Sequence, residues 1–332
     1  PLFMDNSVVW KPSNQAVMSN YTVYELLVEA GMPREVIQFV PGDPTLFTEV
    51  ISNSHHMASI AFTGSDRVFN DILKNVYGKI DKYRNYPRIV GETGGFNYHL
   101  VLPDISSIED MDTIVNKTVL GAFEYSGQKC SATSKLIVPN EHLEYFIERL
   151  SGKMNRLQVG SPEEDNCFTS AVIGEDSFNR AHNYILRNSN KVLAGGKCDN
   201  SMGYYIYPTL IMDENHALEK EYGEVFAPVL SICGYDPENL DETIYHINNS
   251  KYALTTGVFT RNQVHFNKFN NTCGNLYFND KSTGSIVGQQ IFGGFRKSGT
   301  NDKAGSEHLL TRFGNIQTTK FSYELREEEE VF

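Results

Sequence analysis

Short apolar runs and amphipathic stretches alternate along the first third of the chain. The apolar runs predict three buried strands, at residues 7–10, 36–40 and 57–62. Apolar side chains at helical spacing predict three helices, at residues 14–29 with Ser13 or Asn14 as the cap, 44–53 and 68–77. A strand and helix order of this kind predicts a parallel sheet with right-handed crossovers, an architecture common in nucleotide sites that does not itself name a ligand.

The alternation continues through the rest of the chain. Strands are expected at 88–91 and 98–102 around a turn at 92–95, and a helix at 107–125 leads into a cysteine loop. Further strands are expected at 135–138, 191–194, 229–235, 255–259 and 275–278, with helices at 140–152, 238–248 and 262–269. We therefore expect an α/β fold with two domains.

Composition narrows the class of protein. The 332 residues allow two domains, and a net charge of -12 without a basic cluster argues against nucleic acid or an anionic membrane as partner. No apolar run approaches the ~18 residues that a membrane span needs. The five cysteines are scattered without a CxxC pair, which indicates a reducing compartment and neither a disulfide framework nor a metal site. The acidic run at 327–330 is expected to be a solvated tail.

Cys130 is the strongest candidate for chemistry. It lies in a polar loop with Gly127 and Lys129, where a helix gives way to a strand. A positive neighbour or oriented backbone amides can lower a thiol pKa and raise the thiolate fraction. The plainer interpretation is that Cys130 is a small buried side chain, as free cysteines often are.

Two other segments could serve such a nucleophile. Glu92 ends a strand and precedes Gly94 and Gly95, so its carboxylate can project into a cleft as a general base; otherwise it is a turn residue. The Gly64-Ser65 pair at a helix start can bind a phosphate, although Ser65 can equally be a simple helix cap. The sequence contains neither a GxGxxG nor a GxxxxGK[ST] motif.

Taken together, the motifs resemble the aldehyde dehydrogenase family over almost the whole chain. The marks occur in family order and comprise Trp10-Lys11-Pro12-Ser13, Phe62-Thr63-Gly64-Ser65, Gly91-Glu92-Thr93-Gly94-Gly95, Gly127-Gln128-Lys129-Cys130, Glu224-Val225-Phe226-Ala227-Pro228-Val229, Asn279 and Phe292-Gly293-Gly294. The segments 123–132, 279–290 and 298–303 resemble the branch that oxidises L-glutamate γ-semialdehyde, formed from Δ1-pyrroline-5-carboxylate, in proline breakdown, and residues 83–88 look closest to fungal members.

The resemblance implies a Rossmann-like cofactor domain and a role for each matching residue. It implies an enzyme in which the Cys130 thiolate attacks the aldehyde, NAD accepts a hydride, and Glu92 activates the water that hydrolyses the thioester. The cofactor-binding residues would be Lys11, Ser13, Gly64, Ser65, Glu224 and Phe226. The substrate would lie against Ser131, Gly284, Ser285 and Phe292.

The resemblance also implies how the chain is divided and where it works. Residues 1–94 would be the end of the cofactor domain, 95–297 the catalytic domain, and 298–332 a return segment with an oligomerisation strand at 315–322 and the acidic tail. A homodimer or larger homo-oligomer in the mitochondrial matrix is expected. The chain starts at Pro1, and the family's oxyanion asparagine is expected upstream of it.

Two other functions remain open from the sequence. Phe96 replaces a lysine that the family carries after Gly95, and the upstream asparagine lies outside the sequence. A non-catalytic relative that acts in binding or assembly is therefore one alternative. A thioester or ester hydrolase that uses Cys130 and Glu92 without redox chemistry is the other.

Overall fold

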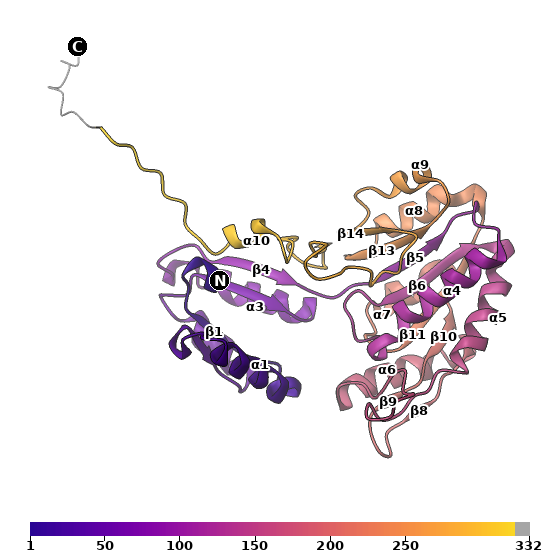
Figure 1. Cartoon of the computed structure of the whole chain (residues 1–332), viewed down its shortest axis with the longest axis horizontal. Coiled ribbons are helices and arrows are strands. Elements are labelled where there is room, and N and C mark those ends of the chain that lie inside the picture. The colour runs from indigo at the N-terminus through magenta and orange to yellow at the C-terminus, as the bar shows by residue number, and fades with distance from the viewer. Residues whose placement is uncertain (323–332) are drawn as a thin grey trace, which may run out of the picture.

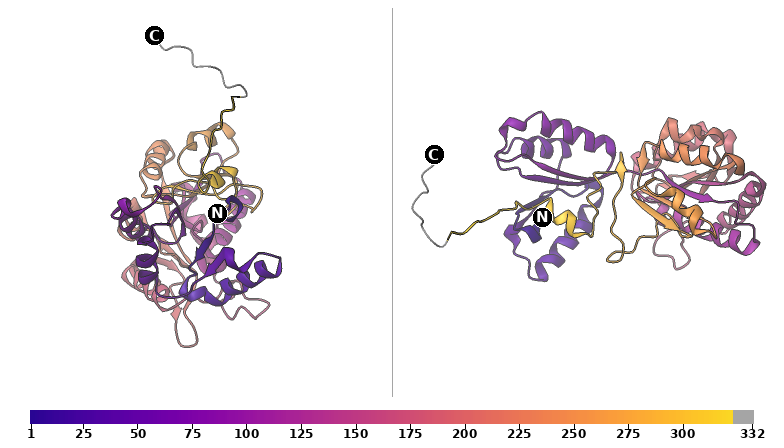
Figure 2. Two further views of the ribbon diagram at one scale, coloured as in Figure 1. Left: turned by 90° about the vertical axis from the view of Figure 1, so that its left-hand side faces the viewer. Right: turned by 90° about the horizontal axis from the view of Figure 1, so that it is seen from above.

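The computed structural model describes residues 1–322, which form two lobes joined by extended segments (Figures 1 and 2). The first lobe holds the chain up to strand β4 together with helix α10, and the second holds the sequence from β5 to β14. Residues 1–322 include no helix long and apolar enough to cross a membrane. The predicted acidic tail at 327–330 lies outside the described residues.

The first lobe contains two parallel strand pairs in place of the single parallel sheet that the sequence predicts. Strand β1 pairs with β2, and β3 pairs with β4. The elements of this lobe are β1 (Val8–Trp10), α1 (Val17–Glu29), β2 (Ile37–Phe39), α2 (Pro44–Ser52), β3 (Ser59–Thr63), α3 (Asp66–Tyr77), β4 (Arg88–Glu92) and α10 (Glu307–Thr311).

Helix α3 shows why this lobe folds as the pattern predicts. Ser65 caps it, because its hydroxyl accepts a hydrogen bond from the Val68 amide at 3.3 Å. The apolar face buries Phe69 and Val76, and the Phe69 ring stacks on Phe62 of β3 with centroids 5.7 Å apart. The helix is thereby fixed at the carboxyl end of β3.

The second lobe is built on a seven-stranded sheet in the order β14-β13-β5-β6-β11-β10-β7. Only the β10–β7 pair in this sheet is antiparallel. The strands are β5 (Asn97–Val101), β6 (Thr133–Pro139), β7 (Val192–Ala194), β10 (Thr209–Met212), β11 (Val229–Tyr235), β13 (Thr255–Phe259) and β14 (Asn275–Phe278). Short pairs join β8 (Cys198–Asp199) to β9 (Tyr205–Ile206) and β12 (Tyr252–Ala253) to β15 (Phe295–Arg296).

Helices cover both faces of this sheet, so that alternate side chains of β5 enter different cores. Tyr98 and Leu100 pack in the core that includes Ile247 of α8, while Val101 packs in the core that includes Val115 of α4. The helices of this lobe are α4 (Ile108–Phe123), α5 (Leu143–Met154), α6 (Glu175–Arg187), α7 (Ala217–Tyr222), α8 (Leu240–Asn248) and α9 (Gln263–Phe266).

Three expectations need correction. Ser13 makes no side-chain capping bond, and a short 3-10 turn precedes α1, which begins at Val17. Helix α6 and strand β10, which lies next to the edge strand β7, were not predicted. The segment 315–322 is not assigned as a strand, because a ladder requires a neighbouring strand and no strand of the described chain pairs with it. Its Ile316 side chain is 91% exposed.

Candidate active site

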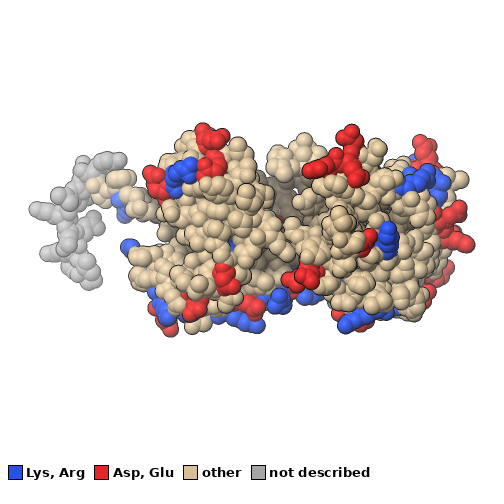
Figure 3. Space-filling model, turned by 90° about the horizontal axis from the view of Figure 1, so that it is seen from below, with Lys and Arg blue, Asp and Glu red and all other residues tan. Residues whose placement is uncertain are grey.

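The candidate site lies where the two lobes meet. Glu92 is the last residue of β4, β5 begins five residues later, and Cys130 precedes β6 by three residues. The segment after β15 returns to this junction, since the Thr93 amide donates to the Ser298 carbonyl and the Gly91 amide to the Thr300 hydroxyl. A space-filling view shows a hollow between the lobes, with acidic and basic side chains interspersed over that face (Figure 3).

A tight turn after α4 places the cysteine. Tyr125 and Ser126 have φ values of 55° and 56°, and Gly127 follows with φ 64°. A side chain on Gly127 would collide with the Ala227 carbonyl, so only glycine fits both the backbone conformation and the space. The cysteine loop therefore rests directly on the segment after Glu224.

The Cys130 thiol has a raised pKa. Burial and the carboxylates of Glu224 and Glu92 raise the pKa of Cys130 to about 11, while the backbone amides of Ser131 and Cys130 oppose this rise. The two amides lower the pKa, as the sequence allows, but the net shift of the thiol is upward and not downward. The Lys129 ammonium pairs with Glu124 at 2.6 Å.

Glu92 is half-buried and opposes a positive charge from the return segment. Burial raises the pKa of Glu92, and the Lys303 ammonium counteracts part of this increase. The Lys303 ammonium donates to the carbonyls of Gly274 and Gly293, at 2.6 and 2.7 Å. The Glu92 carboxylate lies against Gly293, because an added Cβ there would be 3.4 Å from Oε1 of Glu92. A carboxylate, a thiol and an ammonium thus converge on one place.

Glu224 explains the two glycines after Glu92. Its Oε1 accepts a hydrogen bond from the Gly95 amide at 3.0 Å, and a side chain on Gly94 would overlap its Oε2. Burial raises the pKa of Glu224 to about 7, with the Gly95 amide opposing the rise. A side chain on Gly95 would meet the Cys130 carbonyl. The turn at Gly94 and Gly95 is therefore in contact both with the Glu224 side chain and with the backbone of the cysteine loop.

Some cofactor candidates lie near Glu92 and Glu224, and the others lie on the strand pair of β1 and β2. Gly64 and Ser65 open the twelve-residue helix α3 beside Glu92, since the Gly64 amide donates to the Glu92 carbonyl at 3.1 Å. Phe226, with φ 55°, follows Glu224 closely. Lys11 and Ser13 lie on the other strand pair, after β1, where the Lys11 ammonium donates to Asn14 at 3.0 Å.

The substrate candidates surround the cysteine. The Ser131 carbonyl accepts a hydrogen bond from the Ser282 hydroxyl at 2.7 Å, which ties the loop carrying Gly284 and Ser285 to the cysteine loop. The Ser285 hydroxyl bonds to the Tyr277 hydroxyl. Phe292 lies beside Gly293 and forms a bridge with Ala304.

A cluster of charge beside these loops was not found from the sequence. Glu124 pairs with Lys129 at 2.6 Å and lies 3.7 Å from the ammonium of Lys281. The two lysines and one glutamate carry one net positive charge at the edge of the substrate loop. Lys303 was also missed, because 211 positions separate it from Glu92 and no local pattern links them.

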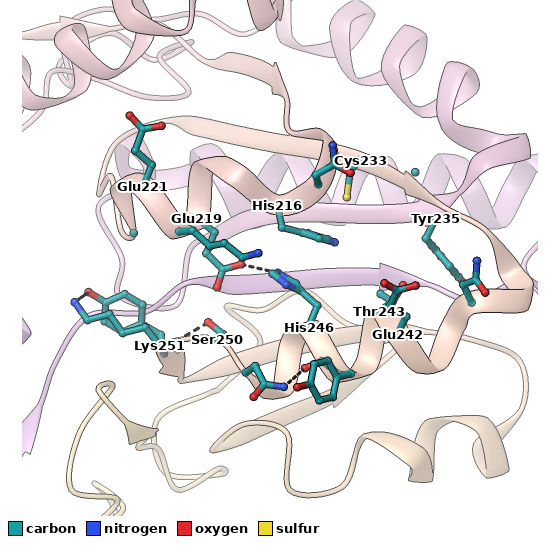
Figure 4. Close-up of a pocket in the computed structure, with 18 of the residues that line it drawn as sticks. His216, Glu219, Glu221, Cys233, Tyr235, Glu242, Thr243, His246, Ser250 and Lys251 are labelled. Carbon is teal, nitrogen blue, oxygen red and sulfur yellow. Dashed lines mark hydrogen bonds and ion pairs between the residues drawn. The ribbon is translucent and has the colours of Figure 1, made fainter.

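A cavity of about 810 Å³ lies away from Cys130, between α7, β11 and α8 (Figure 4). In it, His246 bonds to Glu219 at 2.9 Å and stacks on His216 with centroids 3.6 Å apart. Neither Cys130 nor Glu92 lines this cavity. It approaches the site at Gly223, next to Glu224, and at Lys251, which pairs with Asp66 of α3 at 2.8 Å.

Comparisons of the sequence with a family model and with known proteins identify similar proteins. The aldehyde dehydrogenase family model matches residues 1–319. The mitochondrial Delta-1-pyrroline-5-carboxylate dehydrogenases of Homo sapiens and Emericella nidulans are each 42% identical to this chain, in alignments that cover 96% of it. The chain spans 58% of the length of each of these relatives.

A solved structure shows the same agreement at the level of the fold. The 1-pyrroline-5-carboxylate dehydrogenase from Thermus with bound NAD superposes with a TM-score of 0.85 at 33% identity. The match covers 93% of this chain and 59% of that protein. The chain therefore belongs to the aldehyde dehydrogenase family.

Proposed function

We propose that this protein oxidises L-glutamate γ-semialdehyde to L-glutamate with NAD, through a thioester on Cys130. The observation that carries the proposal is the convergence of the Cys130 thiol with the Glu92 and Glu224 carboxylates at the junction of the lobes. The relatives named above as pyrroline-5-carboxylate dehydrogenases, mitochondrial in two cases, support it.

Cys130 would act as the nucleophile. Its Sγ loses a proton and attacks the aldehyde carbon, and the amides of Cys130 and Ser131 favour the anionic sulfur. Because burial disfavours the free thiolate, that proton leaves to solvent as the sulfur attacks, and Glu92 stays ionised for the later step. NAD, when bound, supplies the acceptor for the hydride that leaves the aldehyde carbon, which converts the adduct to a thioester.

Glu92 would then act on water. Its carboxylate accepts a proton as the water oxygen attacks the thioester carbon, and glutamate leaves as Cys130 regains its thiol. This role requires an ionised carboxylate. Lys303 favours the ionised form, because its positive charge lowers the pKa of Glu92 that burial raises.

The substrate would be selected by the loops around the sulfur. Gly284 and Ser285 provide amides that a carboxylate can approach closely, and Ser131 lies next to the nucleophile. The net positive charge of Lys129, Glu124 and Lys281 favours an anionic substrate at this edge. Phe292 would form an apolar wall.

The residues that would hold NAD fit its chemistry. The start of α3 at Gly64 and Ser65 offers helix amides to a pyrophosphate. Glu224, whose carboxylate contacts Gly94 and Gly95, would hold the nicotinamide ribose, and Phe226 would also contact the cofactor. Lys11 and Ser13 would contact the adenosine ribose from the end of β1.

We further propose the division of the chain and its setting. Residues 1–94 would form part of the cofactor domain, 95–297 the catalytic domain and 298–332 the return segment. The segment at 315–322, in which Ile316 is 91% exposed, would add a strand to a second copy in a homodimer or larger oligomer, because exposed extended backbone favours such pairing. We also propose a mitochondrial matrix location, and the word mitochondrial in the relatives' names supports the organelle.

The test compares substrates with the complete protein that the gene encodes. Formation of NADH from NAD should be fast with pyrroline-5-carboxylate and slow with propanal. Rapid oxidation of propanal without oxidation of pyrroline-5-carboxylate would refute the substrate. Absence of any nicotinamide nucleotide binding would favour a hydrolase instead. Light scattering that shows only monomers would refute the oligomer.

A further inference from the structure

His99 is a buried titratable group that the proposed chemistry does not use. It lies on β5, and its side chain is 0% exposed. Both ring nitrogens have partners from other elements. Nδ1 is 2.9 Å from the Thr118 hydroxyl of α4, and Nε2 is 2.9 Å from the Ser282 amide and 3.1 Å from the Thr133 hydroxyl.

The partners determine which nitrogen carries the proton. A backbone amide can only donate, so Nε2 of His99 must accept from Ser282 and carries no hydrogen. Nδ1 therefore carries the hydrogen and donates it to the Thr118 hydroxyl. Burial lowers the pKa of His99 to about 3, which keeps this neutral form at ordinary pH.

The same ring joins two loops of the site. The Ser282 hydroxyl donates to the carbonyl of Ser131, which can only accept, so Ser282 in turn accepts from the Thr133 hydroxyl at 2.9 Å. Ser131 is adjacent to Cys130, and Ser282 opens the loop that carries Gly284 and Ser285. The distance between the nucleophile and the substrate loop thus depends on this buried network.

The surrounding backbone leaves space for the network. An added Cβ on Gly121 of α4 would overlap the Thr133 hydroxyl and lie 3.4 Å from Cε1 of His99. An added Cβ on Gly257 of β13 would lie 3.2 Å from Cδ2 of the same ring. Glycine therefore stands on both neighbouring elements where a larger residue would displace the imidazole.

We propose that His99, as the neutral Nδ1-protonated form, is a positioning residue that sets the spacing between the Cys130 loop and the Ser282–Ser285 segment. The inference rests on the proposed function, because this spacing would decide how well an aldehyde with a carboxylate and an amine fits. His99 does not touch the reacting atoms. It acts through the hydrogen bond that its Nε2 accepts from the Ser282 amide, and the Thr133 hydroxyl, whose one hydrogen goes to Ser282, packs against the ring.

Selectivity between two aldehydes tests the proposal in the complete protein. Ser282→Ala and His99→Gln should lower kcat/KM for pyrroline-5-carboxylate relative to propanal by about tenfold, mainly through KM. Ser177→Ala removes a buried hydroxyl on α6 and serves as the matched control, with the ratio unchanged. If His99→Gln does not fold, Ser282→Ala tests the link to Ser131, and the protonation of His99 in the unaltered protein tests the histidine itself.

A second readout does not depend on turnover. Nitrogen NMR of protein labelled at histidine should show His99 as the neutral Nδ1-protonated form from about pH 5 to about pH 9. Titration of His99 in that range, or equal losses for both aldehydes in Ser282→Ala, would overturn the proposal. An unaltered protein that oxidises neither aldehyde would instead refute the proposed function on which it rests.

Discussion

The buried ion pair of Lys135 and Asp213 gives the sharpest prediction of stability. Both side chains are 0% exposed, and the Lys135 ammonium is 2.6 Å from Oδ2 of Asp213. The other carboxylate oxygen accepts from the Leu218 amide at 3.0 Å. Lys135→Met keeps most of the side-chain volume but leaves the Asp213 charge buried with one hydrogen bond.

The expected cost follows from that unpaired charge. Removing one partner of a buried pair lowers the free energy of unfolding by about 3–5 kcal/mol, since desolvation is no longer offset. The double variant Lys135→Met with Asp213→Asn should recover most of the loss, because it removes both charges and keeps an oxygen for the Leu218 amide.

Urea unfolding followed by circular dichroism measures these differences. Lys74→Met is the matched control, because Lys74 pairs with Asp71 at 3.7 Å with both side chains more than half exposed. It should unfold like the unaltered protein. A Lys135→Met variant that loses less than about 1 kcal/mol, or a double variant less stable than the single one, would refute the reasoning.

The remaining predictions concern the site. Glu92→Gln should keep the first burst of NADH in stopped flow but slow steady turnover by about 100-fold, and a lost burst would contradict the order of steps. Lys303→Met should raise the pKa of Glu92. As the pH is lowered, turnover should therefore be lost at a higher pH than in the unaltered protein, and an unmoved pH profile would argue against this pairing. Gly95→Ala places a methyl group against the Cys130 carbonyl and should abolish thiol labelling in a soluble, folded protein. Normal labelling would show that the loop can shift.

Local patterns predict much of this fold. The expected strands at 255–259 and 275–278 match β13 and β14, because each is rich in β-branched or aromatic residues. Strand β10 was missed although it pairs with a strand on each side. It has four residues and follows Pro208, so its length and its neighbour both weaken the signal.

Contacts between residues that are far apart in the sequence limit how much of the site could be predicted. Cys130 and Glu92 could be singled out because each lies at or near a recognisable strand in a segment that contains glycine. The partner of Lys129 could not, since its side chain can reach several acids and the structure selects Glu124. The bond between His99 and Ser282 joins positions 183 residues apart, which no local pattern encodes.

The most direct test of the account follows both products of the reaction. The complete protein, supplied with NAD and pyrroline-5-carboxylate, should form NADH and glutamate in equal amounts, and Cys130→Ala should form neither. Glutamate released without NADH, or NADH formed by the Cys130→Ala variant, would contradict a hydride transfer that passes through this sulfur.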